Sequence, residues 1–323
     1  MNRRGRFDVL FSGRLAAAER EPWRQALRDA APEFTWWDDD DVDLPRQSIA
    51  VAVVANPAPA ALAGLPQLRL VQSLWAGVEK LLADASLPPA VPLARMVDPV
   101  MNQAMAETAL WAVLALQRGF FAYAALQRAG EWRPQAQRRA AEVAVLVLGL
   151  GQMGRTAASA LAAQGFSVSA WRTGLRAAAE PPPDGVAVRG GAAVLTAMAA
   201  QAEIVVNLLP LTPATRGLLD AGFFAALPAG ASLVNLARGA HVNDPDLLAA
   251  LDRGHLKHAV LDVFNAEPLP AAHPYWNHPR VTVLPHVAAL TDARSAAAVV
   301  ARNLRALRDG APLANLVDRA RGY

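Results

Sequence analysis

The sequence predicts an α/β protein with two doubly wound parallel-sheet domains, the first of which is discontinuous. Short apolar runs rich in β-branched residues alternate with alanine- and leucine-rich helical stretches along nearly the whole chain. Strands that are apolar on both faces are typical of parallel sheets covered by helices on each side. The 323 residues are also too many for one ordinary core and suit two domains of about 150 residues each.

The composition is that of a globular protein, with 54% hydrophobic and 18% charged residues. The 31 basic and 28 acidic residues leave a net charge of only +3, and no stretch gathers it into a basic stripe, so nucleic acid is not an expected partner. The absence of cysteine excludes disulfides, thiolate catalysis and cysteine-based zinc sites. We recognise no targeting segment or membrane span, and therefore expect a cytoplasmic protein.

The elements are predicted from runs and periodicity. The predicted strands are 7–11, 49–54, 68–72, 143–148, 167–171, 204–208, 232–236, 259–263 and 281–284. The predicted helices include 22–30, 153–163, 244–253 and 292–308. A long helix is expected near 101–127, and its most apolar part, 106–126, is expected to be a buried helix and not a membrane span, because it carries Glu107, Gln117, Arg118 and Gly119.

Two breaks in this alternation indicate the domain boundaries. A proline cluster (Pro88, Pro89, Pro92 and Pro99) precedes the long helix, and the polar stretch 133–139 follows it. The last helix has no strand after it, so we expect it to return to the first domain. The predicted domains are therefore 1–99 with 288–323, and 100–287.

A glycine-rich turn, Gly149-Leu-Gly151-Gln152-Met153-Gly154, follows the strand at 143–148 and opens a helix. The first glycine permits the tight turn, Gly151 lets a pyrophosphate approach the backbone, and Gly154 lets the helix pack closely on the sheet. Phosphates then meet the free N–H groups of the helix N-terminus. The pattern predicts a Rossmann-like dinucleotide site that includes Gln152 and Met153.

The end of the next strand indicates which dinucleotide binds. Sites that prefer NAD place an Asp or Glu there to bind the ribose hydroxyls, but this chain reads Trp171-Arg172-Thr173. A guanidinium and a hydroxyl suit a 2′-phosphate, so the sequence favours NADP (NADPH) over NAD. Arg176 could assist. The alternative is that Arg172 is one more exposed arginine in an arginine-rich chain.

Three later strand ends carry an Arg, a Glu and a His, namely Arg238, Glu267 and His286. Carboxyl ends of parallel strands converge on the ligand crevice, where His286 could donate a proton to a developing alkoxide. Glu267 would orient and charge the imidazole, and Arg238 would bind a substrate carboxylate and polarise its carbonyl. Each residue also has an alternative role when taken alone: Arg238 could form a surface ion pair, Glu267 could belong to a Glu-Pro turn, and His286 could be a structural histidine.

These motifs resemble the D-2-hydroxyacid dehydrogenase family over essentially the whole chain. The segments that carry the resemblance are the glycine-rich turn, Asn207–Pro213, Asn235–Gly239, Leu261–Phe264, Glu267–Pro268 and Pro285–Ala288. Within the family, Trp171-Arg172, Arg238–His241 and the ending Asp318–Tyr323 resemble the bacterial glyoxylate/hydroxypyruvate reductase A group.

The resemblance implies an oxidoreductase that uses NADPH to reduce a small 2-keto acid, glyoxylate or hydroxypyruvate, to the D-2-hydroxy acid. It implies Arg238, Glu267 and His286 as the catalytic set, in a cleft between a flavodoxin-like substrate-binding domain and a dinucleotide-binding domain. It also implies a homodimer formed through the helix near 101–127. Further implied contacts are Trp75, Ala76 and Gly77 with the substrate, Leu236, Ala237 and Asp262 with the nicotinamide, and Leu209 and Pro210 as cofactor-pocket wall.

Two other functions stay open at this point. One is a dinucleotide-sensing, corepressor-like protein, and the other is a dehydrogenase of the same family for a bulkier 2-hydroxy acid, because Trp75 changes the size of the pocket. The remaining histidines are expected to be structural, with His241 close to the cofactor. No metal is expected, since no Cys or acid cluster completes a site.

Overall fold

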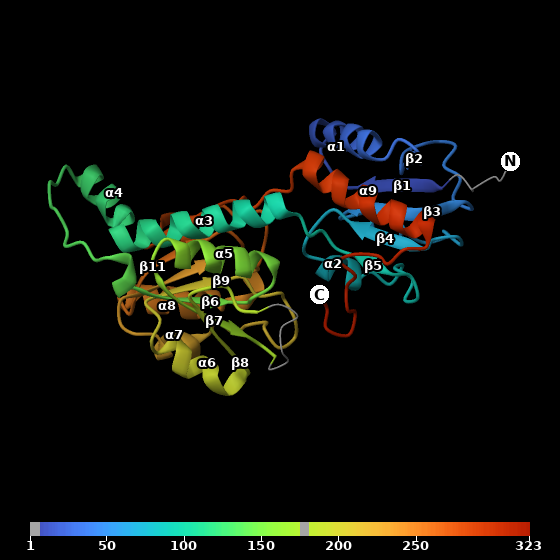
Figure 1. The fold of residues 1–323 in the computed structure, drawn as a ribbon. Coiled ribbons are helices and arrows are strands. Elements are labelled where there is room, and N and C mark those ends of the chain that lie inside the picture. Colours follow the sequence, from blue (N-terminus) through green and yellow to red (C-terminus); the bar gives the residue numbers. More distant parts are fainter. Residues whose placement is uncertain (1–6, 175–180) are drawn as a thin grey trace. The chain divides into compact units, whose positions relative to one another are not determined.

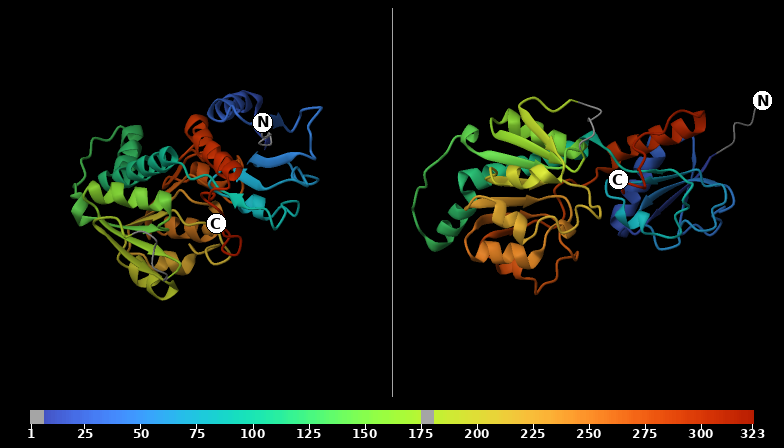
Figure 2. Two further views of the ribbon diagram at one scale, coloured as in Figure 1. Left: turned by 45° about the vertical axis from the view of Figure 1, so that its right-hand side comes forward. Right: turned by 90° about the horizontal axis from the view of Figure 1, so that it is seen from below.

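The structure is a computed structural model that describes residues 7–174 and 181–323, so Arg176 lies outside the described residues. The chain forms two compact units, which Figures 1 and 2 show as ribbons. Unit 1 comprises Met1–Val100 and Thr291–Tyr323, and unit 2 comprises Met101–Leu290. Each unit is built on one parallel sheet, which confirms the predicted α/β class.

Unit 1 has a five-stranded sheet in the order β2-β1-β3-β4-β5. Its strands are β1 (Asp8–Gly13), β2 (Thr35–Asp38), β3 (Ile49–Ala55), β4 (Leu70–Ser73) and β5 (Leu93–Ala94), and its helices are α1 (Ala17–Ala30), α2 (Glu79–Leu82) and α9 (Ala293–Asp309). All seven residues of β3, the central strand, are buried. Helix α9 packs beside α1 although they are far apart in sequence (Figure 1), and Arg305 Nε donates to Glu33 Oε1 at 2.7 Å.

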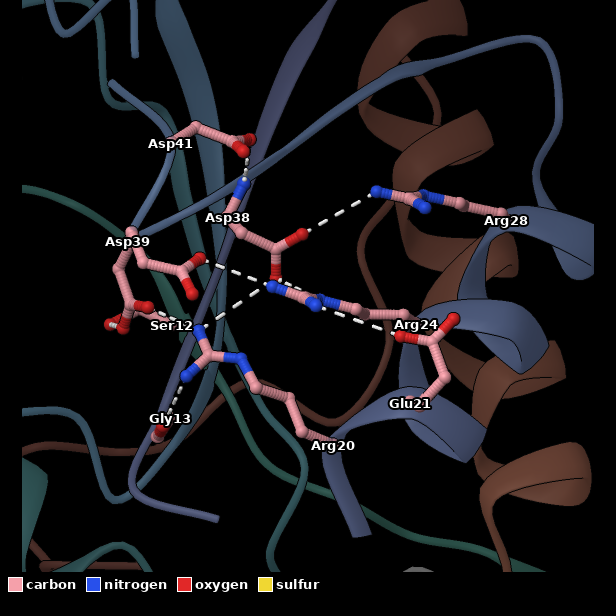
Figure 3. Close-up of polar contacts among 10 residues, drawn as sticks. Ser12, Gly13, Arg20, Glu21, Arg24, Arg28, Asp38, Asp39 and Asp41 are labelled. Carbon is pink, nitrogen blue, oxygen red and sulfur yellow. Dashed lines mark hydrogen bonds and ion pairs between the residues drawn. The ribbon is translucent and has the colours of Figure 1, made fainter. Parts of the chain in front are cut away.

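An ion-pair network fixes α1 on the edge strand β2 (Figure 3). Arg20, Arg24 and Arg28 project from successive turns of α1 toward the carboxylates that end β2. Asp38 is only 3% exposed, and its Oδ1 accepts a 2.8 Å hydrogen bond from Arg24 Nε. Arg20 also pairs with Asp39. A largely buried carboxylate needs such partners, so the network holds the position of α1.

Unit 2 has a seven-stranded sheet in the order β12-β11-β10-β9-β6-β7-β8. Its strands are β6 (Ala144–Leu148), β7 (Ser167–Arg172), β8 (Val186–Gly190), β9 (Ile204–Asn207), β10 (Ala231–Asn235), β11 (Leu256–Leu261) and β12 (Val281–Val283). Its α-helices are α3 (Pro99–Arg118), α4 (Phe120–Ala129), α5 (Gln152–Ala163), α6 (Ala192–Ala199), α7 (Ala221–Ala226) and α8 (Asp244–Asp252). The strand order reverses between β6 and β9, and ligands bind at such a switch point.

The prediction of one long helix over 101–127 is wrong, because α3 ends at Arg118 and α4 begins at Phe120. Gly119 separates them with φ +72°, a left-handed conformation that ends a helix and that glycine adopts readily. The buried face of α3 packs on the strands of unit 2. Among the described residues, no single helix has the length and apolarity to span a membrane; α3 and α4 pass that test only as a pair, bent by 59°.

Candidate active site

The turn after β6 has the close packing that its glycines predict. Gly149 adopts φ +94°, and a Cβ there would lie 2.6 Å from the Leu208 carbonyl oxygen. A Cβ on Gly154 would overlap the carbonyl oxygen of Gly149, whereas one on Gly151 would meet no atom within 4 Å. Helix α5 begins directly after Gly151. Two glycines therefore allow the turn to pack, and the third leaves open space beside a helix N-terminus, which fits a pyrophosphate.

The end of β7 carries a guanidinium with an unsatisfied donor. Arg172 is partly buried, and its Nε has no hydrogen-bond partner among the described residues. Thr173 beside it is exposed. An orphaned N–H costs free energy unless a ligand accepts from it, so Arg172 fits an anionic group. Trp171 is only 3% exposed: its Nε1 donates to the Gly191 carbonyl at 2.9 Å, and its own carbonyl accepts from the Gly149 N–H at 2.8 Å, so its contact with a cofactor stays a prediction.

His286 follows β12 and is paired with Glu267. The imidazole Nδ1 lies 2.8 Å from Glu267 Oε2, and Glu267 Oε1 accepts from the Phe264 N–H at 2.9 Å. The backbone of His286 has φ +57°, and its side chain is 51% exposed. Glu267 is thus held by the backbone and in turn fixes the imidazole, so that Nε2 is the ring atom left to act on a ligand.

Asp262, at the carboxyl end of β11, holds the segment that follows His286. Its two carboxylate oxygens accept from the N–H groups of Val287 at 2.7 Å and Ala288 at 3.1 Å. The residue is 1% exposed, and burial raises the pKa of its carboxyl above the usual range. The sequence assigned Asp262 only to the nicotinamide; in the structure both of its oxygens bind backbone of the His286 segment.

Two asparagines that the sequence analysis gave no role fix the segment around Arg238. Asn235, the last residue of β10, accepts through Oδ1 from the Ala237 N–H at 3.2 Å and from Asn207 Nδ2 at 2.9 Å. Its Nδ2 donates to the Arg238 carbonyl at 3.0 Å. Both asparagines are fully buried. An asparagine directly at the end of an apolar strand was the sequence signal for this network, because a buried amide must find backbone partners.

The segments that carry Arg238 and Glu267 touch through a glycine. A Cβ on Gly239 would overlap the carbonyl group of Phe264, whose N–H binds Glu267. Arg238 itself is partly buried, and its Nη1 donates to the Ala237 carbonyl at 2.6 Å. The structure thus brings the strand ends of β10, β11 and β12 side by side, with Arg238, Glu267 and His286 following them.

The other residues predicted to line the cofactor pocket lie at the ends of β9 and β10. Leu209, Leu236 and Ala237 are buried, with exposures of 4%, 3% and 6%. The Pro210 carbonyl accepts from Thr215 Oγ1 at 2.7 Å and lies 3.3 Å from Nε2 of the buried His241. Leu209 and Leu236 pack in the hydrophobic core of unit 2, and the contact of these residues with a cofactor stays a prediction.

Trp75, Ala76 and Gly77 lie in unit 1, in the loop after β4, and all three are partly exposed. The Trp75 N–H donates to Ser73 Oγ at 3.0 Å, and the Trp75 carbonyl accepts from the Met96 N–H at 3.0 Å. The indole of Trp75 packs edge-on against Trp23 of α1, with ring centroids 6.0 Å apart. Helix α1 and the neighbouring chain segment therefore fix both the backbone and the ring of Trp75.

The other histidines have structural partners. His258 on β11 stacks on Phe121 with ring centroids 4.4 Å apart, and its Nε2 lies 2.9 Å from Thr282 Oγ1. Burial, aided by the charges of His278 and Lys257, lowers the pKa of His258 to about 4. In the part of the chain that the structure describes, no group of three or more His, Cys, Asp or Glu side chains could hold a metal ion.

A glycine-rich turn at the switch point of a parallel sheet, together with an acid-paired imidazole after another strand of the same sheet, defines a dinucleotide-binding protein of the dehydrogenase type. Residues 110–288 match the family model described as D-isomer specific 2-hydroxyacid dehydrogenase, NAD binding domain. The chain belongs to the D-isomer specific 2-hydroxyacid dehydrogenase family.

Similar proteins extend this comparison to the whole chain. A glyoxylate/hydroxypyruvate reductase A of Serratia proteamaculans (strain 568) is 40% identical over 94% of this chain and 96% of its own. A D-isomer specific 2-hydroxyacid dehydrogenase from Xanthobacter autotrophicus Py2, solved with NADPH and MES, is 39% identical with a TM-score of 0.92 over 99% and 100% of the two chains. An NADPH-dependent glyoxylate/hydroxypyruvate reductase from Sinorhizobium meliloti, solved with NADP and sulfate, is 35% identical with a TM-score of 0.90 over 98% and 100%.

Proposed function

We propose that this protein reduces a small 2-keto acid, glyoxylate or hydroxypyruvate, to the D-2-hydroxy acid with NADPH as reductant. The observation that carries the proposal is the pair formed by His286 and Glu267 at 2.8 Å, beside the strand end that bears Arg238. The relatives named as glyoxylate/hydroxypyruvate reductases support the choice of substrate.

Each residue of the pair has a step to perform. When bound, NADPH supplies the hydride that the carbonyl carbon accepts. His286 donates the proton from Nε2 to the carbonyl oxygen, so that the ketone gains one hydride and one proton. Glu267 accepts from Nδ1–H, which orients the ring and stabilises the imidazolium before the proton is transferred. Arg238 binds the substrate carboxylate and draws electron density toward the carbonyl oxygen.

The preference for NADPH is proposed on Arg172. Its buried, unpartnered Nε is suited to a 2′-phosphate, with the Thr173 hydroxyl beside it. The turn from Gly149 to Gly154 would hold the pyrophosphate on the first N–H groups of α5, together with Gln152 and Met153. Leu209, Pro210, Leu236, Ala237 and Asp262 would form the wall around the nicotinamide.

Unit 1 is proposed as the substrate-binding domain and unit 2 as the dinucleotide-binding domain. Trp75, Ala76 and Gly77 follow a strand and precede α2; because the Trp75 N–H already donates to Ser73 Oγ, the N–H groups of Ala76 and Gly77 would bind a substrate carboxylate. We further propose a homodimer that covers the α3–α4 region. Trp111 is 43% exposed and Phe120 54% exposed there, and large apolar side chains exposed together are typical of a protein interface.

The primary test is the loss of NADPH absorbance against a panel of 2-keto acids. Turnover of glyoxylate or hydroxypyruvate supports the proposal. Turnover of bulkier 2-keto acids alone would instead favour a dehydrogenase of the same family with a bulkier substrate. Tight dinucleotide binding without any turnover would instead favour a sensing protein.

Two variants test the residue roles. His286→Ala should lower kcat by about 10²–10⁴-fold while NADPH binding stays near normal, since general acid catalysis contributes about that much. Equal loss of turnover and NADPH binding would make His286 structural. Arg172→Asp should shift the preference toward NADH, and an unchanged preference would remove Arg172 from the phosphate site.

A further inference from the structure

Arginines in unit 1 generally have partners. Arg20, Arg24 and Arg28 meet the carboxylates at the end of β2 (Figure 3), Arg305 meets Glu33, and Arg319 donates to the carbonyls of Pro88 and Val91. These pairings give each of these guanidinium groups at least one carboxylate or carbonyl partner, although Arg20 Nε is buried without one. Arg95 is different, and the difference lies at the edge of the sheet where ligands bind.

Arg95 directly follows β5, one residue beyond the paired positions Gln72 and Ala94. Its backbone is held, because its N–H donates to the Asn315 carbonyl at 3.0 Å and the next N–H, of Met96, donates to the Trp75 carbonyl. The side chain is partly buried. Among the described residues its guanidinium has no hydrogen bond, ion pair or aromatic partner, and burial lowers the pKa of Arg95 below its usual value with no carboxylate to offset it.

A second unsatisfied donor lies on the adjoining segment. The indole Nε1 of Trp75 is buried and has no hydrogen-bond partner among the described residues. Its ring is held by Trp23, so the N–H does not simply turn toward water. Indole and guanidinium groups donate hydrogen bonds and accept none. A buried indole N–H without a partner, on a segment that touches the one bearing a partly buried cation, suits a ligand that accepts hydrogen bonds and carries negative charge.

We propose that Arg95 binds a carboxylate of the substrate at the carboxyl edge of the unit 1 sheet, with the Trp75 indole N–H as a second donor. The inference rests on the proposed function for the identity of the ligand as a 2-keto acid. The carboxylate has two possible sources: the one beside the keto group, or a second one at the far end of a dicarboxylic 2-keto acid. In either case Arg95 is an anion-binding residue additional to Arg238.

The competing interpretation is structural. An arginine stem often covers apolar surface while its head group stays near water, and its removal then costs stability alone. The two interpretations differ in what the variant changes, because only a ligand-binding residue alters KM and carboxylate affinity in protein that remains folded.

The kinetic test uses Arg95→Met, Arg95→Lys and Trp75→Phe in the full chain with saturating NADPH. Arg95→Met should raise KM for 2-ketoglutarate, which carries both carboxylates, about 10–100-fold, the effect expected for loss of a charged hydrogen bond, with NADPH affinity unchanged. Arg95→Lys should recover part of the loss, and Trp75→Phe should raise KM by less than Arg95→Met. The matched control is Arg69→Met, just before β4 at the opposite edge, where Arg69 lies over the Phe7 ring at 5.3 Å; its KM should equal that of the wild type.

The panel distinguishes the two sources. If Arg95 binds the carboxylate beside the keto group, KM rises for glyoxylate and for 2-ketoglutarate alike; if it binds a distal carboxylate, KM rises for 2-ketoglutarate alone. An unchanged KM for both acids, in folded Arg95→Met and Arg95→Lys, overturns the proposal while the proposed function stands.

A measurement without turnover separates this proposal from the function. N-oxalylglycine has the two carboxylates of 2-ketoglutarate but an amide in place of the reducible ketone, and it can be titrated calorimetrically into the NADPH-loaded protein. Its affinity should fall at least tenfold in Arg95→Met and stay unchanged in Arg69→Met. If the wild type reduces no 2-keto acid but this difference in affinity is found, the proposed function fails and the carboxylate site stands. If Arg95→Met does not fold, Arg95→Lys and Trp75→Phe decide, and wild-type affinity for N-oxalylglycine in both overturns the proposal.

Discussion

Asp262 offers a way to separate the positioning of His286 from contact with the cofactor. In the variant Asp262→Asn the side chain keeps its volume but presents one acceptor and one donor to the N–H groups of Val287 and Ala288. One charged hydrogen bond is lost, and the NH2 group of the asparagine then faces a backbone N–H, which is also a donor. Such a bond contributes about 1.5–3 kcal/mol, partly offset because a neutral amide costs less to bury than a carboxylate. We expect the free energy of unfolding to fall by about 1–3 kcal/mol.

The same change should reach catalysis, because His286 directly precedes Val287. A small displacement of a catalytic group lowers the rate by up to about 100-fold, so we expect kcat to fall 10–100-fold with NADPH affinity within about twofold of wild type. Urea unfolding, initial rates and fluorescence titration with NADPH measure the three quantities. The control is Asp252→Asn in the same unit: its side chain is 71% exposed and the amide oxygen can still accept from His278 Nε2, so stability, kcat and NADPH affinity should stay near those of the wild type. If NADPH affinity falls and kcat does not, Asp262 acts on the cofactor and the positioning argument is wrong.

Three further changes test other contacts. Gly154→Ala should weaken NADPH binding at least 100-fold in a fluorescence titration, because its Cβ would overlap the Gly149 carbonyl oxygen and displace the turn; wild-type affinity would show that the turn can give way. For His258, with a pKa lowered to about 4, the neutral ring favours the folded state, so its contribution is complete above about pH 6.5 and falls by about 3 kcal/mol as the pH drops to 4. Urea unfolding at several pH values should therefore show a shallower acid loss in His258→Gln than in wild type, and parallel curves would contradict the assignment. Trp23→Ala should raise KM for glyoxylate with little change in kcat, because it frees the Trp75 ring; unchanged kinetics would mean that this contact does not matter to the substrate.

The strands that the sequence predicted are those with a neighbouring strand on both sides, together with β12, which lies at the edge of its sheet. The strands β2, β5 and β8 were missed, and each lies at the edge of its sheet. An edge strand is covered less by the rest of the protein, so its sequence need not be a continuous apolar run. Strand β8 reads Val-Ala-Val-Arg-Gly, and Ala187 and Arg189 on one of its faces are exposed. The break at Gly119 was missed for a related reason, since the apolar composition continues through it and a single glycine is often tolerated within a helix.

At the site, the sequence placed the charged residues at strand ends, because a parallel sheet directs those ends to one edge. It did not give their partners. Asp262 was assigned to the nicotinamide, yet its oxygens bind the N–H groups after His286, and Asn235 had no role although it binds the Arg238 backbone. Which donor a buried polar group finds depends on the course of a neighbouring loop, and no local pattern in the sequence encodes that course.

The site combines an exposed polar residue, His286, with a buried one, Asp262, and this combination has a physical basis. His286 must be open to a substrate, and with half of its side chain exposed it cannot be fixed by packing alone. Its position therefore depends on bonds to Glu267 on one side and, through the following residues, on Asp262 on the other. A buried carboxylate with two backbone donors has no lower-energy arrangement nearby, because moving either donor leaves a charge unsatisfied in a poorly solvated site. The group that does the chemistry can remain accessible because the group that positions it is buried and fully bonded.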